Sequence, residues 1–311
     1  EKIDESHLIP SHLLRTIREL YHARENLSRV VKLADMLLQK EASLDQKVSQ
    51  DVRYYLCLSL ARQKDRRVIQ EALKIRGPEH DFILGYYYRL TGRHAEAIER
   101  LSSIVNTPYI SSRAKRELVQ VYLYIDEFDK ALEMARENYV LNRGNQYPIQ
   151  SYLHCLLNTG NLAQNKTEVD RLIAELEQIG SAQAMEMSLI AKGLLIAKSN
   201  GSKQQDYNHI DDAIALGLGA PYPYFAKFDV ALKFMDITMM STVLSELEQL
   251  SESRTFSKNT IVKNRAFYLA ATGKLDEAKK MLNGGLENYP KETIEKFNVK
   301  LDYISSNAHG L

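Results

Sequence analysis

Catalytic chemistry would require nucleophiles, acids, bases or metal ligands at characteristic spacings. The sequence contains eight histidines and two cysteines, yet it has no H-E-x-x-H pair and no Cys/His set at zinc-ligand spacing. It also lacks a G-x-x-x-x-G-K-[ST] loop and a G-x-G-x-x-G turn. The stretch G-L-G-A-P at 217–221 follows a predicted helix, not a strand, and therefore indicates a helix break. We expect no catalytic residue, no cofactor and no metal, and we predict that the chain is not an enzyme.

Charge and hydropathy narrow the classes of partner. The 311 residues include 41 basic and 40 acidic side chains, a formal net charge of +1, which argues against general affinity for nucleic acid or an anionic membrane. No run approaches the ~20 apolar residues that span a bilayer, and no signal-peptide pattern opens the chain. Cys57 and Cys155 lie inside helical patterns, which is typical of small buried side chains. We predict a cytoplasmic protein in a reducing compartment.

A 34-residue period organises the middle of the chain. Small residues, aromatic residues and turn residues recur at this offset, with turns expected at Gly92, Asp126 and Gly160. Each turn lies between two helical patterns, so each period predicts one helix hairpin. The recurring positions are Leu84, Gly85, Tyr88, Ala97 and Leu101 in the first period, Leu118, Val119, Tyr122, Ala131 and Ala135 in the second, and Tyr152, Leu153 and Leu156 in the third.

This period, with its small packing residues, resembles the tetratricopeptide repeat. The best match lies at 258–290, where the family positions are Ala266, Leu269, Gly273, Ala278, Leu282 and Pro290. The resemblance implies an all-α, right-handed superhelical solenoid of about seven helix hairpins with a C-terminal capping helix, because one hairpin cannot bury its own apolar face.

We predict a single solenoid domain over 1–311, with four parts of differing regularity. Polar segments at 200–206 and 251–257 are expected to be a loop and a hinge, and the residues after Ser305 are expected to fray. The four parts are irregular hairpins at 10–76, regular repeats at 78–160, irregular repeats at 161–257, and the matched repeat with its cap at 258–305.

The resemblance also implies where a ligand binds. In the family, the first helix of each hairpin lines a concave groove, and a mixture of aromatic, arginine and amide side chains there suits a protein surface. Phe82 and Tyr86 stand where the family's clamp for acidic chaperone peptides has lysine and asparagine, so we do not predict a co-chaperone. The residues implied to face the groove are Phe82, Tyr86, Arg89, Arg113, Arg116, Gln120, Tyr124, Gln150, His154 and Asn158.

These features predict a non-catalytic protein- or peptide-recognition module, a scaffold or adaptor with its ligand in the concave groove. Because the chain begins with Glu, we also expect it to be the sensor or docking arm of a larger multidomain protein, such as a bacterial signalling or defence ATPase. Two alternatives remain open: self-association that sets the oligomeric state, and RNA binding of the pentatricopeptide kind. The basic cluster at 62–76 is interpreted as a solvated face.

Overall fold

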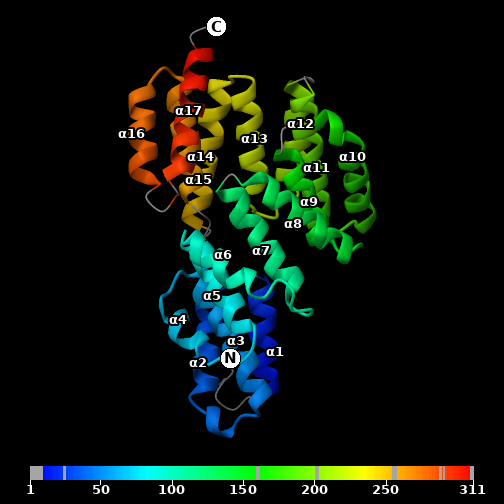
Figure 1. Cartoon of the computed structure of the whole chain (residues 1–311), viewed down its shortest axis with the longest axis vertical. Coiled ribbons are helices and arrows are strands. Elements are labelled where there is room, and N and C mark those ends of the chain that lie inside the picture. The colour runs from blue at the N-terminus through cyan, green and yellow to red at the C-terminus, as the bar shows by residue number, and fades with distance from the viewer. Residues whose placement is uncertain are drawn as a thin grey trace, which may run out of the picture. The chain divides into compact units, whose positions relative to one another are not determined.

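The computed structural model describes residues 10–23, 26–125, 127–158, 162–199, 203–253, 258–286, 289 and 291–308. In these segments the chain forms α-helices, one short 3-10 helix and no strand (Figure 1). The all-α prediction is therefore confirmed. No helix in the same segments is both long enough and apolar enough to cross a bilayer.

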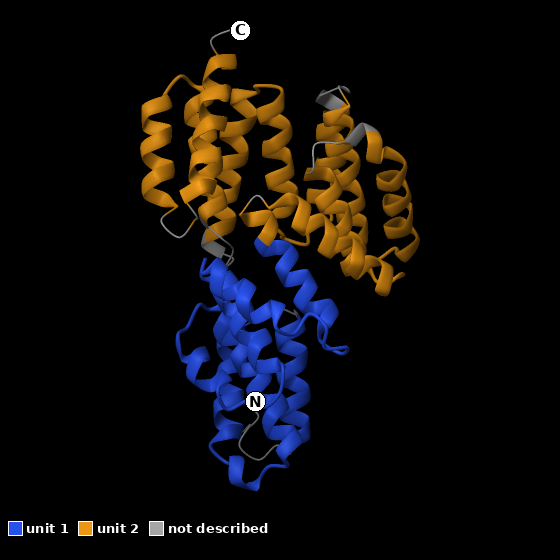
Figure 2. Cartoon of the chain, viewed as in Figure 1, with its two compact units in different colours: residues 1–121 blue, residues 122–311 orange. Residues whose placement is uncertain are grey.

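The chain divides into two compact units, residues 1–121 and 122–311 (Figure 2). Unit 1 holds three helix hairpins and most of a seventh helix. The prediction of one continuous domain stays a prediction. The elements of unit 1 are α1 (Pro10–Ala23), α2 (Leu27–Leu38), the 3-10 helix η2 (Glu41–Ser43), α3 (Gln46–Arg62), α4 (Arg67–Ala72), α5 (Glu79–Leu90), α6 (His94–Ser102) and α7 (Ser111–Tyr124), whose last turn belongs to unit 2.

Unit 2 continues the alternation to the C-terminal end of the described chain. It begins within α7 and ends with a long unpaired helix. Its elements are α8 (Phe128–Leu141), α9 (Gln146–Asn158), α10 (Leu162–Ile179), α11 (Ala182–Lys198), α12 (Lys203–Ala215), α13 (Tyr222–Lys233), α14 (Ile237–Ser253), α15 (Lys258–Ala271), α16 (Leu275–Gly285) and α17 (Lys291–Ala308).

Each unit stacks its helices in two layers. Successive odd-numbered helices contact one another, as α1 with α3, α3 with α5, and α9 through α17 in turn. Most even-numbered helices pack between the odd-numbered helices before and after them, as α2 does between α1 and α3. A repeated hairpin buries its apolar stripe against its neighbours in this way. We call the surface formed by the odd-numbered helices of a unit its odd-helix face.

Small residues permit the close approach of paired helices. A Cβ added at Gly85 would lie 2.5 Å from Cγ of Leu101, so α5 and α6 meet where the sequence places its packing glycine. Gly193 plays the same part in unit 2, because a Cβ there would lie 2.8 Å from Ile210. Gly92, at φ 79°, makes the predicted turn between α5 and α6. These contacts confirm the predicted use of small residues between antiparallel helices.

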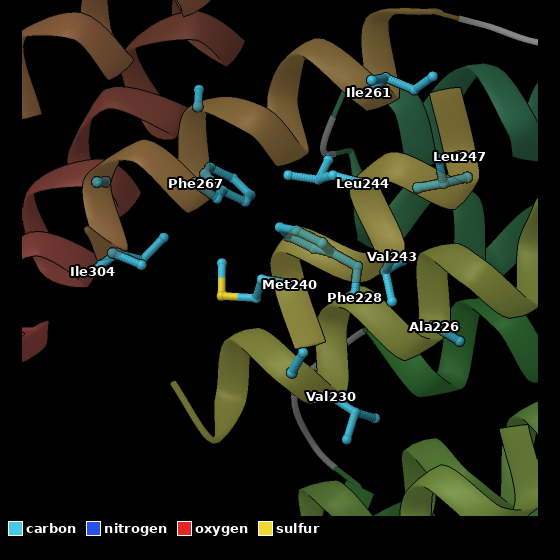
Figure 3. Close-up of a cluster of buried hydrophobic side chains, with 14 of the residues drawn as sticks. Ala226, Phe228, Val230, Met240, Val243, Leu244, Leu247, Ile261, Phe267 and Ile304 are labelled. Carbon is cyan, nitrogen blue, oxygen red and sulfur yellow. The ribbon is translucent and has the colours of Figure 1, made fainter. Parts of the chain in front are cut away.

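An extended buried cluster of unit 2 lies between its helices. Phe228 of α13 and Phe267 of α15 are almost fully buried, and Leu244 of α14 packs with them. Figure 3 shows these three side chains converging on one interior region. The first residues of unit 2 contact the segment that leads into α17. Tyr124 stacks on Tyr289 at 4.7 Å, and Thr293 Oγ1 donates a hydrogen bond to the Ile125 carbonyl at 3.4 Å.

Several predicted boundaries require correction. Helix α12 begins at Lys203, α14 continues to Ser253 and α17 continues to Ala308, so the expected loop, hinge and frayed end are shorter than predicted. Polar residues there do not end the helix, because polar composition alone does not break helical backbone geometry. The hairpins from α1/α2 to α15/α16 number eight, against about seven expected. The turn residues Asp126 and Gly160, and Pro290, lie outside the described residues.

Candidate protein-recognition surface

Side chains from four odd-numbered helices of unit 1 contact one another in a closed ring. Each member is within aromatic-contact, cation–π or hydrogen-bonding distance of the next, and the last returns to the first. We call this set the arginine–tyrosine ring. Its members, in order, are Tyr21 of α1, Tyr55 and Tyr54 of α3, Arg113 of α7, Phe82 and Tyr86 of α5, and Arg62 of α3.

Arg113 joins α7 to the two preceding odd-numbered helices. Its guanidinium carbon lies 4.4 Å from the centre of the Phe82 ring and 5.3 Å from the centre of the Tyr54 ring. Its Nη2 donates a hydrogen bond to the phenol oxygen of Tyr54. A guanidinium group carries five N–H donors, so this contact leaves most of the donors of Arg113 available to a ligand.

Arg62, at the last turn of α3, occupies the opposite side of the ring. Its guanidinium carbon lies 4.1 Å from the centre of the Tyr21 ring. Its Nε donates to the Tyr86 phenol oxygen and its Nη1 donates to the Tyr21 carbonyl, both at 3.3 Å. Neither Arg62 nor Arg113 forms an ion pair with a residue in the described segments, whereas the neighbouring Arg18, Arg89 and Arg116 do.

One buried carboxylate organises two further arginines beside the ring. Glu117 of α7 is 5% exposed, and it accepts from Arg89 Nε at 2.7 Å and from Arg116 Nη2 at 3.3 Å. Burial acts to raise the pKa of Glu117, but the two guanidinium groups outweigh it and hold that pKa below its usual value. Glu117 is thus an anion that is already neutralised within the fold.

The charges on and around the ring leave a positive excess. Five arginines face three carboxylates, a local net charge of +2 (5 − 3), although the whole chain carries only +1. The carboxylate of Glu79 also lies near Tyr54. The groups counted are Arg18, Arg62, Arg89, Arg113 and Arg116 against Asp51, Glu79 and Glu117.

Tyr21 and Tyr54 of the ring stay neutral at physiological pH. Burial raises the pKa of Tyr54 to about 12, and it also raises the pKa of Tyr21. A neutral phenol combines an apolar ring with a polar tip, which suits a surface that is covered by a protein ligand. Tyr54, Tyr55 and Tyr86 are half-buried, so part of each ring remains accessible.

The structure brings four of the predicted groove residues of unit 1 into one contact network. Tyr86, Arg89, Arg113 and Arg116 are all half-buried on its odd-helix face. Phe82 differs, because it is 2% exposed and serves as an interior support beneath Tyr86 and Arg113. Its expected direct role in lining the groove is corrected accordingly. Gln120, also half-buried on α7, completes the predicted set in this unit.

The predicted residues of unit 2 are engaged mainly within their own unit. Tyr124 stacks on Tyr289, Gln150 Nε2 donates to the Gln183 carbonyl at 3.1 Å, and Asn158 Nδ2 donates to the His154 carbonyl at 2.8 Å. Burial is the main cause that lowers the pKa of His154, so its imidazole is neutral at physiological pH. Of these contacts, the one from Gln150 joins α9 to α11.

Sequence reasoning missed the part of the ring that α1 and α3 contribute. Tyr21, Tyr54, Tyr55 and Arg62 lie in the irregular hairpins, where the 34-residue period does not assign an inward face. The grouping of Arg62 with the basic cluster at 62–76 concealed its role, since other members pair elsewhere, as Arg67 does with Asp35 at 2.9 Å. The available signal was the aromatic pair at 54–55, eight and seven residues before an arginine on one predicted helix.

The fold resembles solved helical-repeat structures. A chain of the APC/C hetero-tetramer Cut9–Hcn1 matches with a TM-score of 0.55 at 13% identity, over 93% of this chain and 55% of that chain. The apo form of RapI matches with a TM-score of 0.51 at 10% identity, over 96% of this chain and 97% of that chain. A tetratricopeptide repeat protein from Parabacteroides merdae matches with a TM-score of 0.47 at 12% identity, over 94% and 98% of the two chains.

These likenesses define the class of fold. The chain has the all-α, stacked helix-hairpin fold of the Cut9–Hcn1 chain and of RapI, and the predicted fold class is confirmed. It spans about half the length of the matched Cut9–Hcn1 chain. No protein-family model matches the sequence, and no curated protein matches it.

Proposed function

We propose that the chain is a non-catalytic protein-recognition module, a scaffold or adaptor, whose ligand binds the odd-helix face of unit 1. The arginine–tyrosine ring is the observation that supports this. Tyrosine and arginine are the residue types that contribute most binding energy at protein interfaces. Here all of them except the buried Tyr21 are half-buried, and they are held by one another, so little side-chain entropy is lost when a ligand covers them.

A variant of the ring tests the proposal. Tyr86→Ala with Arg113→Ala should remove the native partner from a pull-down, with a loss of at least ~2 kcal/mol in binding, the scale of a hot-spot loss. The matched control is Tyr88→Ala with Arg93→Ala, because Arg93 lies 4.3 Å from the Tyr88 ring and pairs with Glu96 away from the ring. Equal retention by both variants, with melting curves like the wild type, would refute the assignment.

We further propose that this module is the sensor or docking arm of a larger multidomain protein, such as a bacterial signalling or defence ATPase. A recognition surface without a catalytic motif supports this, because sensing and catalysis are then assigned to different domains. An immunoblot of the native host with an antibody against these 311 residues tests it. A native product no larger than this chain would contradict the proposal.

Self-association is the second candidate, and one observation favours it. Val299 and Tyr303 lie one turn apart on α17, and their exposed fractions are 69% and 70%. A terminal helix with exposed apolar residues is a surface on which a second copy could stack. Light scattering of the isolated chain would show a concentration-independent dimer if this were its role, and Tyr303→Ser would abolish that dimer.

A further inference from the structure

The two ring arginines have N–H donors that no residue in the described segments accepts from. Arg113 uses one of its five N–H donors and Arg62 uses two, on phenol and backbone oxygens. Guanidinium groups that are partly buried are normally paired with a carboxylate. Glu117, the one carboxylate buried beside the ring, already accepts from Arg89 and Arg116. The ring therefore lacks an anion that its chemistry favours.

We propose that the ligand of the ring is an acidic peptide segment, with carboxylates of glutamate or aspartate accepting from Arg62 and Arg113. This inference rests on the proposed function and names the chemistry of the partner. Each guanidinium is planar and lies near an aromatic ring, Arg62 near Tyr21 and Arg113 near Phe82. The N–H donors that remain on such a guanidinium can pair with a carboxylate, and two adjacent donors bind it as a fork.

Charge supports the same ligand. The local excess of +2 on the ring attracts an acidic segment, and complementary charge raises both the association rate and the specificity of such a complex. The half-buried rings of Tyr54, Tyr55 and Tyr86 add apolar contact for the peptide backbone and for carbon atoms of its side chains. Acidic residues interspersed with small apolar residues fit both features.

A peptide fits the ring better than a single-stranded nucleic acid. Base stacking needs open aromatic faces, whereas Phe82 and Tyr21 are only 2% and 7% exposed and are covered by Arg113 and Arg62. Nucleic-acid surfaces also exclude carboxylates, because they follow a phosphate backbone with a continuous basic stripe. Here Glu79 and Glu117 adjoin the ring.

The experiment measures fluorescence anisotropy of a labelled 12-residue peptide of alternating glutamate and alanine against the full chain. A matched peptide of alternating glutamine and alanine, and a labelled 12-nucleotide oligouridine, are the two comparison probes. We expect the glutamate peptide to bind at least about tenfold more tightly than either, and its affinity to fall as salt rises from about 50 to 300 mM. Equal binding of the glutamine peptide, tighter binding of oligouridine, or no binding of the glutamate peptide would each overturn the proposal.

Single substitutions test whether Arg113 and Arg62 bind the glutamate peptide. Arg113→Gln should weaken the glutamate peptide by about tenfold, because a charge-assisted contact is lost. Arg113→Lys should also weaken it by several-fold, because an ammonium group keeps the charge but loses the fork. Arg93→Gln is the matched control and should leave the affinity unchanged, since Arg93 pairs with Glu96 away from the ring. Arg62→Gln provides a second test, read only if its melting curve matches the wild type. If Arg113→Gln and a folded Arg62→Gln both bind the glutamate peptide as the wild type does, the peptide does not bind at these two arginines.

The outcome separates this inference from the proposed function. If the glutamate peptide fails to bind while the Tyr86 and Arg113 double variant still loses the native partner, the surface recognises a protein but not through acidic residues. If that double variant keeps the partner, the recognition surface itself is misplaced. In both cases the acidic-peptide proposal is rejected, and the two rejections have different readouts.

Discussion

Each unit carries a cluster of cationic and aromatic side chains on consecutive odd-numbered helices, but the two clusters differ in chemistry. In unit 1 the cations are arginines and the rings are mainly tyrosines, as in the pairing of Arg62 with Tyr86. In unit 2 the cations are lysines and the rings are phenylalanines. Lys300 Nζ lies 4.8 Å from the centre of the Phe267 ring, and Lys263 Nζ lies 5.7 Å from that of Phe297.

The difference between the two clusters determines whether the orientation of each cation is fixed. A phenol accepts a hydrogen bond from a guanidinium and fixes its orientation, whereas phenylalanine offers a lysine only the electrostatic attraction of its ring. The arginines of the ring are therefore oriented groups, whereas Lys263 and Lys300 act on their phenylalanine rings as point charges. Burial lowers the pKa of Lys198 in unit 2, and the neighbouring Lys300 and Lys233 lower it further, whereas Asp229 raises it. We infer that the ring of unit 1 can select ligand geometry, whereas the lysine–phenylalanine contacts of unit 2 do not fix the orientation of their cations.

The largest expected effect comes from glycines that separate the layers of each unit. Gly85→Leu should destabilise unit 1 by about 3 kcal/mol or more, because its side chain would overlap Leu101. Gly193→Leu should do the same in unit 2, where the neighbours are Ile210 and the backbone oxygen of Asp206. Urea unfolding followed by circular dichroism measures both changes.

The matched control for both variants is Gly144→Ala, because no atom lies within 4 Å of a Cβ at that position. Its φ of +79° still adds about 1 kcal/mol of strain. This cost is the reference against which the destabilisation by the two leucine variants is compared. If either leucine variant costs no more than Gly144→Ala, the helices of that unit do not cross at the glycine.

The second comparison contrasts a buried ion pair of unit 1 with an exposed one of unit 2. Glu117→Gln should destabilise the protein by about 2 kcal/mol, because it removes the anion that Arg89 and Arg116 share. Glu248→Gln should cost less than about 0.5 kcal/mol, because Glu248 and its partner Arg265 are both nearly half exposed. Equal shifts in the urea midpoint would show that burial of Glu117 is not what distinguishes the two sites.

The third comparison uses acid. Burial, with Arg89 nearby, lowers the pKa of His94 in unit 1 to about 4, from 6.5 in the unfolded chain. As the pH falls from 6.5 towards 4, the unfolded chain gains a proton that the folded chain does not, so unfolding becomes more favourable. We expect His94→Gln to remove about 1.5 kcal/mol of the stability difference between pH 7 and pH 5.

The control is His12→Gln, which changes an exposed histidine of α1. Urea unfolding at pH 7 and pH 5 is compared for the two variants and the wild type. The same loss of pH dependence in both variants would mean that His94 is not the responsible group.

The smallest expected effect exchanges the two cations between the units. Arg113→Lys should cost about 0.5–1 kcal/mol of stability, because it loses the bond to Tyr54 and weakens the contact with Phe82. Lys300→Arg should be neutral or slightly stabilising, since arginine also packs well on an aromatic ring such as Phe267. Thermal melts of both variants measure this, and a destabilising Lys300→Arg would contradict the proposed difference between the clusters.

The repeats of the fold could be predicted from the sequence because their cause is local. Gly85, Ala97 and Leu101 recur at fixed offsets, and each is buried where α5 meets α6. Hydrophobic period and turn residues therefore sufficed to place most helices within a few residues. Helix ends at Lys203 and Ser253 were missed, since a polar segment looks like a loop when only composition is considered.

The candidate surface was only partly predictable. Tyr86, Arg89 and Arg116 were expected on the odd-helix face, because the repeat pattern assigns that face in α5 and α7. The consecutive residues Tyr86, Tyr87 and Tyr88 take three different roles: Tyr86 joins the ring, Tyr87 is buried and Tyr88 lies beside Arg93. Helical geometry separates successive side chains by about 100°, so composition alone does not show which of the three faces a ligand.

The sequence by itself determined the helices, their hairpin pairing and the small residues between them, since these depend on contacts close along the chain. Only the tertiary structure decided that Tyr21, Arg62 and Arg113 belong to one ring. The hydrogen bond from Arg62 to the Tyr21 carbonyl crosses 41 residues, and that from Arg113 to Tyr54 crosses 59. Contacts at such separations depend on how irregular hairpins stack, and packing of whole helices, not a sequence period, sets that arrangement.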